Sequence, residues 1–272
     1  MDPRKLSELI PFLNERGLRP KKSLSQNFLV DTNVLKKIVK TANLTQNTDV
    51  LEIGPGPGGL TRTLIDEGAH VTAVEIDRKY ADILAETISS PNLKVICEDF
   101  LEFIPTKPYI VIANIPYHIS SPIIEKLVDH IELFPRIFLT VQKDFAQRIL
   151  TLKPSNAFSI FINFYFLASI EFTITKDCFY PKPKDPSVLL SLIARPELPI
   201  PDPKPFIEFV RYLFRRRRKM IRSILGLPDV TDARPEALKL DGFLRLYLLL
   251  KGQNRLPILS EEEGESEEEN SL

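Results

Sequence analysis

The chain is poor in the residues that build cross-links and metal sites. It has 272 residues but only two cysteines, Cys97 and Cys178, and three histidines. The cysteines form no C-x-x-C pair and no cluster with histidine, which argues against a disulfide framework or a zinc site and is typical of a reducing cytoplasm. The histidines, at positions 70, 118 and 130, have unrelated spacings and are interpreted as structural residues. We therefore expect no metal cofactor.

The sequence predicts neither a secretory leader nor a membrane-spanning segment. The N-terminus is charged over residues 2–5, where a signal peptide would lead into an apolar core. The longest apolar stretch, residues 158–170, contains Asn163 and is too short to cross a bilayer, so we interpret it as a core strand. With 43% hydrophobic and 26% charged residues, the composition predicts a globular cytoplasmic protein with no membrane partner.

A net charge is missing as well, but the two signs are unevenly placed. Seven of the 36 acidic residues are glutamates between positions 261 and 269. A run of like charge with so few apolar residues cannot bury a core, so we predict that residues 261–272 are disordered. Without these glutamates the chain has 29 acidic and 36 basic residues, a charge of +7. A basic body favours a polyanionic partner, although many basic surfaces are simply solvated.

Five segments have the composition of buried parallel strands, because they are apolar or β-branched without clean alternation. They lie at residues 49–54, 70–77, 93–99, 109–116 and 136–142. Helix-like segments such as 78–89 and 121–132 separate them, and this alternation predicts a doubly wound α/β sheet. Two further strand candidates, 158–172 and 187–195, are expected to pair antiparallel at one edge of that sheet.

The composition changes after residue 195. Residues 196–205 are proline-rich and are interpreted as a linker. Apolar residues then recur at helical spacing over 206–227, and 234–251 predicts one or two further helices. We predict an α/β domain at 1–195, the linker at 196–205, a small all-helical domain at 206–260 and the acidic tail at 261–272.

A glycine loop follows the first of the five strands. Residues 50–61 read VLEIGPGPGGLT, and glycines 54, 56 and 59 satisfy G-x-G-x-x-G. Such a loop lets a ligand approach the backbone and directs a helix N-terminus at it. The pattern alone is also compatible with a tight strand-to-helix turn, but several glycines at the carboxyl end of one strand favour a ligand site.

Two acidic residues suggest which ligand this site takes. Glu75, at the end of the second strand, has the spacing of a carboxylate that holds ribose hydroxyls, which leaves a dinucleotide and S-adenosylmethionine both open. Asp99, at the end of the third strand, could accept a hydrogen bond from an adenine amino group, and this favours S-adenosylmethionine. The alternative for Asp99 is a helix cap.

The fourth strand ends in an unusual order of residues, Asn114, Ile115, Pro116 and Tyr117. Pro116 biases Ile115 towards an extended conformation, so the Ile115 carbonyl and the Asn114 side-chain oxygen could face the same point. Two acceptors at one point match the two hydrogens of an amino group, and Tyr117 offers a face on which a base can stack. An ordinary turn is the alternative, because Asn and Pro are common turn residues.

These motifs occur in the order found in one known family. The chain resembles the small-subunit ribosomal RNA adenine dimethyltransferases of the bacterial type, which have a Rossmann-like class I methyltransferase fold and methylate two adjacent adenosines near the 3′ end of 16S rRNA. The resemblance extends to about residue 250. It rests on KKSLSQNFL (21–29), EIGPGPGGLT, EIDR, EDFL, NIPYHISSPI, CFYPKPKDPS (178–187) and FRRRRKMIRSIL (214–225).

The resemblance implies a role for each matching position. The cofactor S-adenosylmethionine would be held by Gln26, Asn27, Leu29, Gly54, Gly56, Glu75, Ile76, Asp99 and Phe100, with Asn114 at the same site. Asn114 and the Ile115 carbonyl would hold the target amine, while Tyr117 and Phe179 would stack on opposite faces of the base. RNA phosphates would contact the basic residues of a helix, Arg215, Arg216, Arg217, Arg218, Lys219 and Arg222. A solvated helix face is the alternative for this basic run.

The sequence departs from the family pattern at two places. Ser25 stands where the family usually has glycine, and Asp185, Pro186 and Ser187 stand where a Val-Asp-Ser is usual. The first affects a loop expected to close over the cofactor, and the second affects the geometry next to Phe179. The acidic tail is not a feature of the family and is interpreted as a solubilising segment.

Three other functions compete with this one. A large-subunit adenine methyltransferase of the macrolide-resistance type shares NIPY and the basic segment, but SLSQNFL and RPEALKL favour the small-subunit type. A non-catalytic RNA-binding factor would not need the complete set of cofactor residues. A nicotinamide-dependent dehydrogenase rests on the glycine loop alone. We therefore expect a monomeric cytoplasmic enzyme whose partner is 16S rRNA in a partly assembled small subunit.

Overall fold

The computed structural model describes residues 1–20, 26–151 and 154–257. The predictions about Ser25 and about the tail at 261–272 lie outside these residues. The chain forms two compact units, one containing residues 1–147 and 166–194 and the other containing 148–165 and the chain from 195 onward. The expected domain 1–195 differs from this division, because residues 148–165 group with the C-terminal unit.

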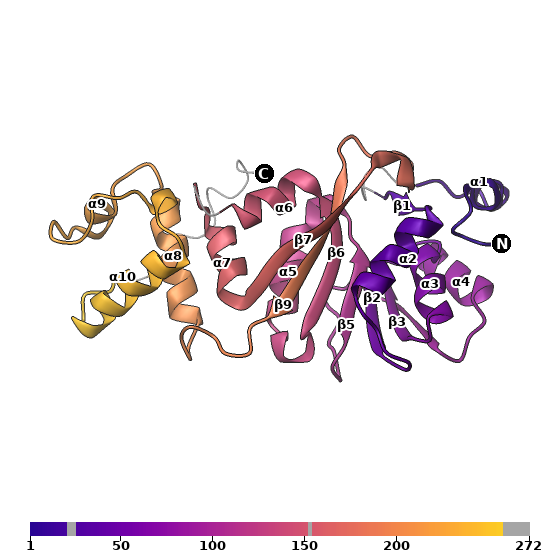
Figure 1. Cartoon of the computed structure of the whole chain (residues 1–272), viewed down its shortest axis with the longest axis horizontal. Coiled ribbons are helices and arrows are strands. Elements are labelled where there is room, and N and C mark those ends of the chain that lie inside the picture. The colour runs from indigo at the N-terminus through magenta and orange to yellow at the C-terminus, as the bar shows by residue number, and fades with distance from the viewer. Residues whose placement is uncertain (21–25, 152–153, 258–272) are drawn as a thin grey trace. The chain divides into compact units, whose positions relative to one another are not determined.

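A seven-stranded sheet is the centre of the first unit (Figure 1). Its order is β4-β3-β2-β5-β6-β9-β7. The first five strands are parallel, and they are β2 (Asp49–Ile53), β3 (His70–Glu75), β4 (Leu93–Cys97), β5 (Ile110–Asn114) and β6 (Arg136–Gln142). Strand β9 (Ser187–Ala194) pairs antiparallel with both β6 and β7 (Phe166–Ile174). The predicted doubly wound sheet with an antiparallel pair at one edge is confirmed.

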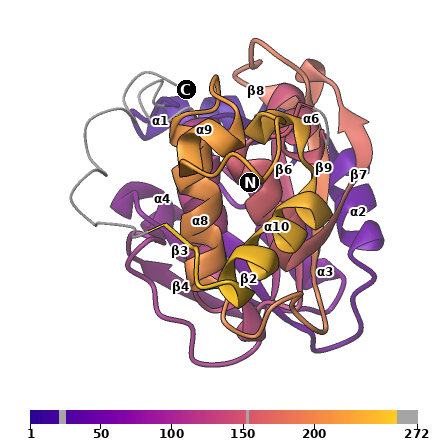
Figure 2. The same cartoon turned by 90° about the vertical axis from the view of Figure 1, so that its left-hand side faces the viewer.

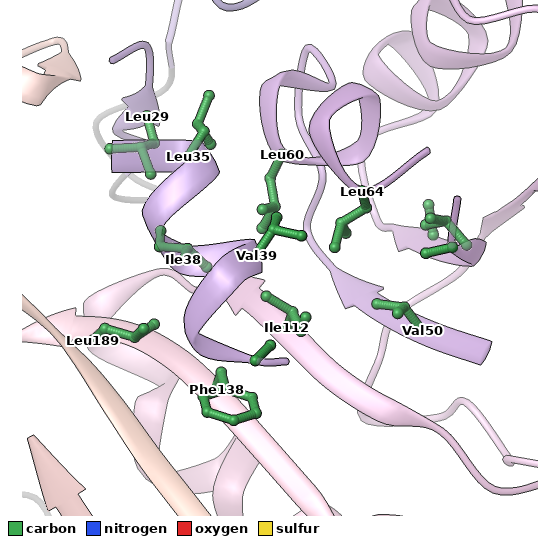
Figure 3. Packing of buried hydrophobic residues seen from close by; sticks show 14 of the residues in the cluster. Leu29, Leu35, Ile38, Val39, Val50, Leu60, Leu64, Ile112, Phe138 and Leu189 are labelled. Atoms are coloured by element: carbon green, nitrogen blue, oxygen red, sulfur yellow. The ribbon is translucent and has the colours of Figure 1, made fainter. Parts of the chain in front are cut away.

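Five helices pack around the sheet, of which α2 precedes the first parallel strand and the other four each follow one. They are α2 (Thr32–Thr41), α3 (Gly59–Asp66), α4 (Arg78–Thr87), α5 (Ser120–Val128) and α6 (Lys143–Leu150). Figure 3 shows α2 and α3 side chains packed over strand residues such as Ile112 and Phe138. The neighbouring strand residues Val111 and Ile137, whose side chains point to the opposite face, are fully buried too. Both faces of the central strands are therefore covered, which explains their continuous apolar sequence.

The N-terminal segment adds a small layer of its own. Helix α1 (Leu6–Glu15) precedes the two-residue strand β1 (Phe28–Leu29), which pairs antiparallel with β8 (Phe179–Tyr180). This second sheet brings the segments 26–29 and 178–187, far apart in sequence, next to each other.

The C-terminal unit is helical, as the sequence predicts. It contains α7 (Ala157–Tyr165), α8 (Lys204–Arg215), α9 (Ile221–Leu225) and α10 (Leu240–Gly252). Its core is aromatic: the ring of Phe206 on α8 lies 5.1 Å from that of Phe164 on α7 and 5.5 Å from that of Tyr247 on α10. Figure 2 shows α8 and α10 of this packed set. In the described part of the chain, no helix has both the length and the apolarity to cross a membrane.

The prediction of a single strand over 158–172 is wrong for its first half. Residues 157–165 form α7, and only from Phe166 does the chain enter β7. Asn156 begins this helix, because its side-chain Oδ1 accepts from the Ser159 backbone N–H at 2.8 Å while its own N–H donates to Ser159 Oγ at 3.0 Å. This reciprocal pair has the logic of a capping box. The apolar run itself fits a buried helix as well as a strand.

The basic run is not part of one continuous helix, which corrects the prediction of a basic helix over 214–225. Helix α8 ends at Arg215, and α9 begins at Ile221 after an extended Met220. The residues between the two helices are exposed. Cations at the carboxyl end of α8 are favoured by the helix dipole, so the run is stable in this position without a helix of its own.

Candidate active site

One cavity lies where the parallel strands β2, β3, β4 and β5 end. It is lined by residues that the sequence predicts for the cofactor and the target base: Gln26, Asn27, Gly54, Gly56, Glu75, Ile76, Asp99, Phe100, Asn114, Ile115, Pro116 and Tyr117. Its other lining residues were not predicted: Phe28, Ile53, Val74, Leu101, His118, Ile119 and Ile123. The carboxyl edge of a parallel sheet is where open α/β folds bind ligands.

The glycine loop forms one wall of this cavity. Gly54 and Gly56 have φ angles of +64° and +54°, in the left-handed region that favours glycine. A Cβ atom at Gly56 would lie 2.9 Å from a ring carbon of Phe28, closer than real contacts allow. Glycine is therefore required at position 56 for two reasons, the left-handed backbone conformation and the close approach of the Phe28 ring.

Glu75 ties the glycine loop to the end of β3. Its two carboxylate oxygens accept from the backbone N–H groups of Gly56 and Asp77, each at 2.9 Å. The side chain is only 4% exposed, and burial raises its pKa although both N–H groups oppose the shift. Each oxygen keeps a second lone pair, so Glu75 can accept hydrogen bonds from two neighbouring hydroxyls of a bound ligand.

Asp99 combines the two roles that the sequence left open. One of its carboxylate oxygens accepts from the Leu101 backbone N–H at 2.9 Å, which caps the turn after β4. The residue also lines the cavity. The other oxygen is available to an amino group of a ligand, with the buried ring of Phe100 next to it along the chain.

Asn114 has a fixed orientation at the end of β5. Its side-chain Nδ2 donates to the Asn27 backbone carbonyl at 2.8 Å. With the nitrogen held in this way, Oδ1 is the acceptor that remains. Ile115 follows in the cavity wall, and Pro116 has the extended angles φ −60° and ψ 132°. That the Ile115 carbonyl is the second acceptor at this strand end stays a prediction.

Tyr117 is held by the segment 178–187. Its hydroxyl lies 2.7 Å from Ser187 Oγ, at the start of β9. Burial raises the pKa of Tyr117, so the phenol stays neutral and the ring is a fixed apolar wall. Ser187, which ends the Asp185-Pro186-Ser187 sequence that differs from the family pattern, therefore has a defined structural role.

Leu29 and Phe179 do not line the cavity. They face each other across the β1–β8 pair and belong to the hydrophobic core, where Phe179 is only 2% exposed. The prediction that Phe179 stacks on the target base does not fit this arrangement. Neighbouring strand residues point to opposite sides, so Phe28 takes the cavity-facing position instead of Leu29. That alternation was the signal in the sequence that could have identified Phe28.

A second buried carboxyl lies beneath the glycine loop. Glu52, on β2, is 1% exposed and accepts a hydrogen bond from the Thr61 hydroxyl of α3 at 2.6 Å. Burial raises the pKa of Glu52 to about 8, and the charge of Glu75 acts in the same direction. Glu52 does not line the cavity and is not among the residues that the sequence predicts for the site.

The cavity fits a cofactor that combines adenine, ribose and a charged amino acid. It offers Glu75 to hydroxyls, Asp99 to an amino group and the glycine loop to a close backbone approach. Among the described residues, no group of three His, Cys, Asp or Glu side chains could hold a metal ion. The parallel sheet with its antiparallel edge pair, the glycine loop and the two carboxylates together define a Rossmann-like methyltransferase.

Comparison with known proteins identifies the family within this class. Residues 17–237 match the model of the family described as "Ribosomal RNA adenine dimethylase". The chain is 38% identical to the ribosomal RNA small subunit methyltransferase A of Protochlamydia amoebophila over 92% of this chain and 98% of that protein. It is 34% identical to the protein of the same name from Streptococcus gordonii, over 89% and 95%. The chain therefore belongs to the ribosomal RNA adenine dimethylase family.

Solved structures agree with this assignment. A dimethyladenosine transferase from Plasmodium falciparum superposes with a TM-score of 0.73 at 26% identity, over 82% of this chain and 96% of that one. The 23S rRNA methyltransferase ErmE superposes with a TM-score of 0.70, also at 26% identity, over 84% and 99%. The fold is thus shared by a dimethyladenosine transferase and by an enzyme named for 23S rRNA, so the fold alone does not select the RNA substrate.

Proposed function

We propose that the protein transfers methyl groups from S-adenosylmethionine to N6 of two adjacent adenosines near the 3′ end of 16S rRNA. It acts in the cytoplasm, as a monomer, on a partly assembled small ribosomal subunit. The observation that carries this proposal is the fixed orientation of Asn114, whose Nδ2 is held by the Asn27 carbonyl at 2.8 Å next to the glycine-loop cavity. The family to which the chain belongs is named for adenine dimethylation, and Asn114 supplies an acceptor for an adenine amine in this cavity.

The cofactor residues fit one end of the cavity. Glu75 would hold the ribose hydroxyls, with Ile76 against the adenine and Asp99 at its amino group. The backbone at Gly54 and Gly56 would approach the methionine part, with Gln26 and Asn27 across the cavity. When bound, S-adenosylmethionine supplies an electrophilic methyl group on a positively charged sulfur.

The other end of the cavity would activate the target nitrogen. An adenine amine is a poor nucleophile because its lone pair is delocalised into the ring. Asn114 Oδ1 and the Ile115 carbonyl would accept its two hydrogens, which favours a pyramidal nitrogen with its lone pair directed along the line of transfer. Tyr117 would stack on the base, which must leave its own stack to enter. The nitrogen would take the methyl group as the bond from that methyl to sulfur breaks, which leaves a neutral thioether. The cationic nitrogen would then lose a proton to water, so no strong base is needed to start this reaction.

Exposed cations of the C-terminal unit would hold the RNA. Arg215, Arg216, Arg217, Arg218 and Lys219 are all exposed, and Arg222 forms an ion pair with Asp232 at 2.7 Å. Among the described residues, we find no ion-pair partner for Arg217 or Arg218. Positive charges without acidic partners are available to phosphates, and their binding releases counterions.

Replacing Arg217 and Arg218 with alanine is expected to weaken RNA binding uniformly across sequences. The slope of log K against log salt should become shallower by about 0.7 to 0.9 for each cation that contacts a phosphate. Fluorescence anisotropy with a labelled 3′-end RNA at several salt concentrations measures this slope. The lysine pair Arg217→Lys/Arg218→Lys keeps the charge and should keep the slope. An unchanged slope in the alanine variant would show that the basic run is only solvated.

Glu75 is expected to control cofactor affinity through the glycine loop. In Glu75→Gln, an NH2 group, which can only donate, replaces one of the two oxygens that accept from Gly56 and Asp77. Two donors then face each other in a buried site, and the affinity for S-adenosylhomocysteine should fall about tenfold or more. Isothermal titration calorimetry measures this change. Exposed Glu102→Gln serves as the control, and equal affinities of the two variants would contradict the role of Glu75.

The decisive experiment is product identification. Tritiated S-adenosylmethionine is incubated with the protein and with small and large subunits that lack adenine dimethylation, and the nucleosides are separated after digestion. N6,N6-dimethyladenosine from the 3′ end of 16S rRNA is the expected product. Label in large-subunit RNA alone would favour the macrolide-resistance type, which has a similar fold. Incorporation into neither subunit, with cofactor binding intact, would favour a non-catalytic RNA-binding factor.

A further inference from the structure

Phe28 joins the cavity to a second apolar cluster. One side of its ring faces the cavity and Gly56, which it approaches closely. Its backbone is held by the two-residue pairing of β1 with β8 and by the neighbouring hydrogen bond from the Val30 N–H to the Cys178 carbonyl at 2.9 Å. So short a pairing is weak by itself, and the position of the ring must depend on what packs behind it.

Helices α1 and α4 supply that packing. Phe28 belongs to a buried cluster with Leu9, Leu13 and Leu18 from the N-terminal segment and with Tyr80 and Ile83 from α4. The rings of Phe28 and Tyr80 meet edge to face, with centroids 5.3 Å apart. Leu9 is fully buried and Leu13 is 2% exposed, so α1 contributes a fixed wall to this cluster.

Ion pairs tie α1 to the two helices that start at the cavity. Arg4, just before α1, pairs with Asp66 of α3 at 2.5 Å, and α3 begins at the glycine loop. Arg16, just after α1, pairs with Glu86 of α4 at 2.8 Å, and α4 begins two residues after Ile76 and three after Glu75. Helix α1 lies before residue 17, where the family match begins. It is thus connected, from outside the segment matched to the family model, to both turns that carry the proposed cofactor residues.

We propose that α1 is a positioning element, in which Leu9 and Leu13 hold Tyr80 and Phe28 against the glycine loop and thereby slow the release of the cofactor. This inference rests on the proposed function, because it takes the cavity to be the S-adenosylmethionine site. Neither leucine lines the cavity, so both act through Phe28. Asn114 and Tyr117 are held by Asn27 and Ser187, neither of which belongs to this cluster, so the methyl-transfer step itself is expected to be unaffected.

The test is the dissociation rate of S-adenosylhomocysteine from the full chain, measured by stopped-flow displacement. In Leu13→Ala the rate constant is expected to rise about tenfold, because a less organised site mainly shortens residence time. KM for S-adenosylmethionine should rise in parallel, while kcat on undermethylated small subunits stays within about twofold. Leu13→Val is the milder variant if the alanine protein does not fold.

A control variant separates positioning from general destabilisation. Leu192→Ala removes an equally buried leucine from β9, where it pairs with Ile137 near the start of β6, at the sheet edge away from the cavity. It should lower the melting temperature without changing the dissociation rate.

The possible failures are distinguishable. If Leu13→Ala and Leu192→Ala change the dissociation rate equally, the inference is overturned and the proposed function stands. If the wild-type protein binds no S-adenosylhomocysteine, the proposed function fails and the inference fails with it. A lower kcat at saturating cofactor with an unchanged dissociation rate would also overturn the positioning role.

Discussion

Replacing Asn114 with alanine is expected to reduce methyl transfer by about 100- to 1,000-fold, the usual effect of removing one preorganised polar group from a reacting centre. The variant loses the acceptor Oδ1 and also the hydrogen bond from Nδ2 to the Asn27 carbonyl. The Ile115 carbonyl alone cannot hold both hydrogens of the target amine. Glu75, Asp99 and the glycine loop remain, so the affinity for S-adenosylhomocysteine should change by less than about tenfold.

The measurement combines single-turnover methyl transfer with calorimetric binding of S-adenosylhomocysteine. Asn33→Ala, an exposed asparagine on α2, is the matched control and should behave like the wild type. Asn114→Asp adds a sharper test, because it keeps acceptor oxygens but loses the donor to Asn27. If orientation matters, the aspartate variant is also slow. Activity of Asn114→Ala within threefold of wild type would remove Asn114 from the reaction.

The sequence predicts the first unit well because its signals there are local. Each parallel strand is an uninterrupted apolar run, and several are followed by a glycine, an acid or an amide at the carboxyl end. Parallel strands place those ends at one edge, so Gly56, Glu75, Asp99 and Asn114 could be assigned to one site from their positions in the sequence alone. The comparisons support the resulting family and fold.

What the sequence did not predict depends on tertiary packing. Residues 157–165 are mostly apolar without a clear helical or strand period, and their contacts with α8, together with the pair between Asn156 and Ser159, favour a helix. Phe28 lines the cavity in place of the predicted Leu29, because the pairing of the two-residue strand β1 decides which of the two side chains faces the cavity. A motif fixes which residues are adjacent in sequence, whereas their orientation is decided by the elements that cover them.

The burial of Glu52 could not be predicted from the sequence either, because the sequence of a strand does not show whether an acidic side chain in it faces water. In the structure Glu52 is buried and accepts only from Thr61 among the hydrogen bonds described, so burial raises its pKa from 4.5 to about 8. Between these values the folded protein binds a proton that the unfolded chain has lost. The stability associated with this proton is complete below the unfolded pKa and is lost as pH rises towards about 8.

The free energy of unfolding of the wild type is therefore expected to fall by about 1.4 kcal/mol per pH unit from Glu52 alone, between about pH 5 and pH 8. Glu52→Gln removes this dependence, because a neutral amide can still accept from Thr61 and never ionises. At pH 5 the two proteins should be about equally stable, and at pH 8 the variant should be more stable by several kcal/mol.

Urea unfolding of the first unit at pH 5, 6.5 and 8 checks this result, with exposed Glu102→Gln as the control that keeps the wild-type slope. A stability difference between wild type and Glu52→Gln that is the same at all three pH values would show that Glu52 is ionised throughout. This result concerns the candidate site because Glu52 lies beneath the glycine loop. Ionised Glu52 would add a second buried negative charge beneath the loop that Glu75 organises, so the loop is most stable while Glu52 keeps its proton.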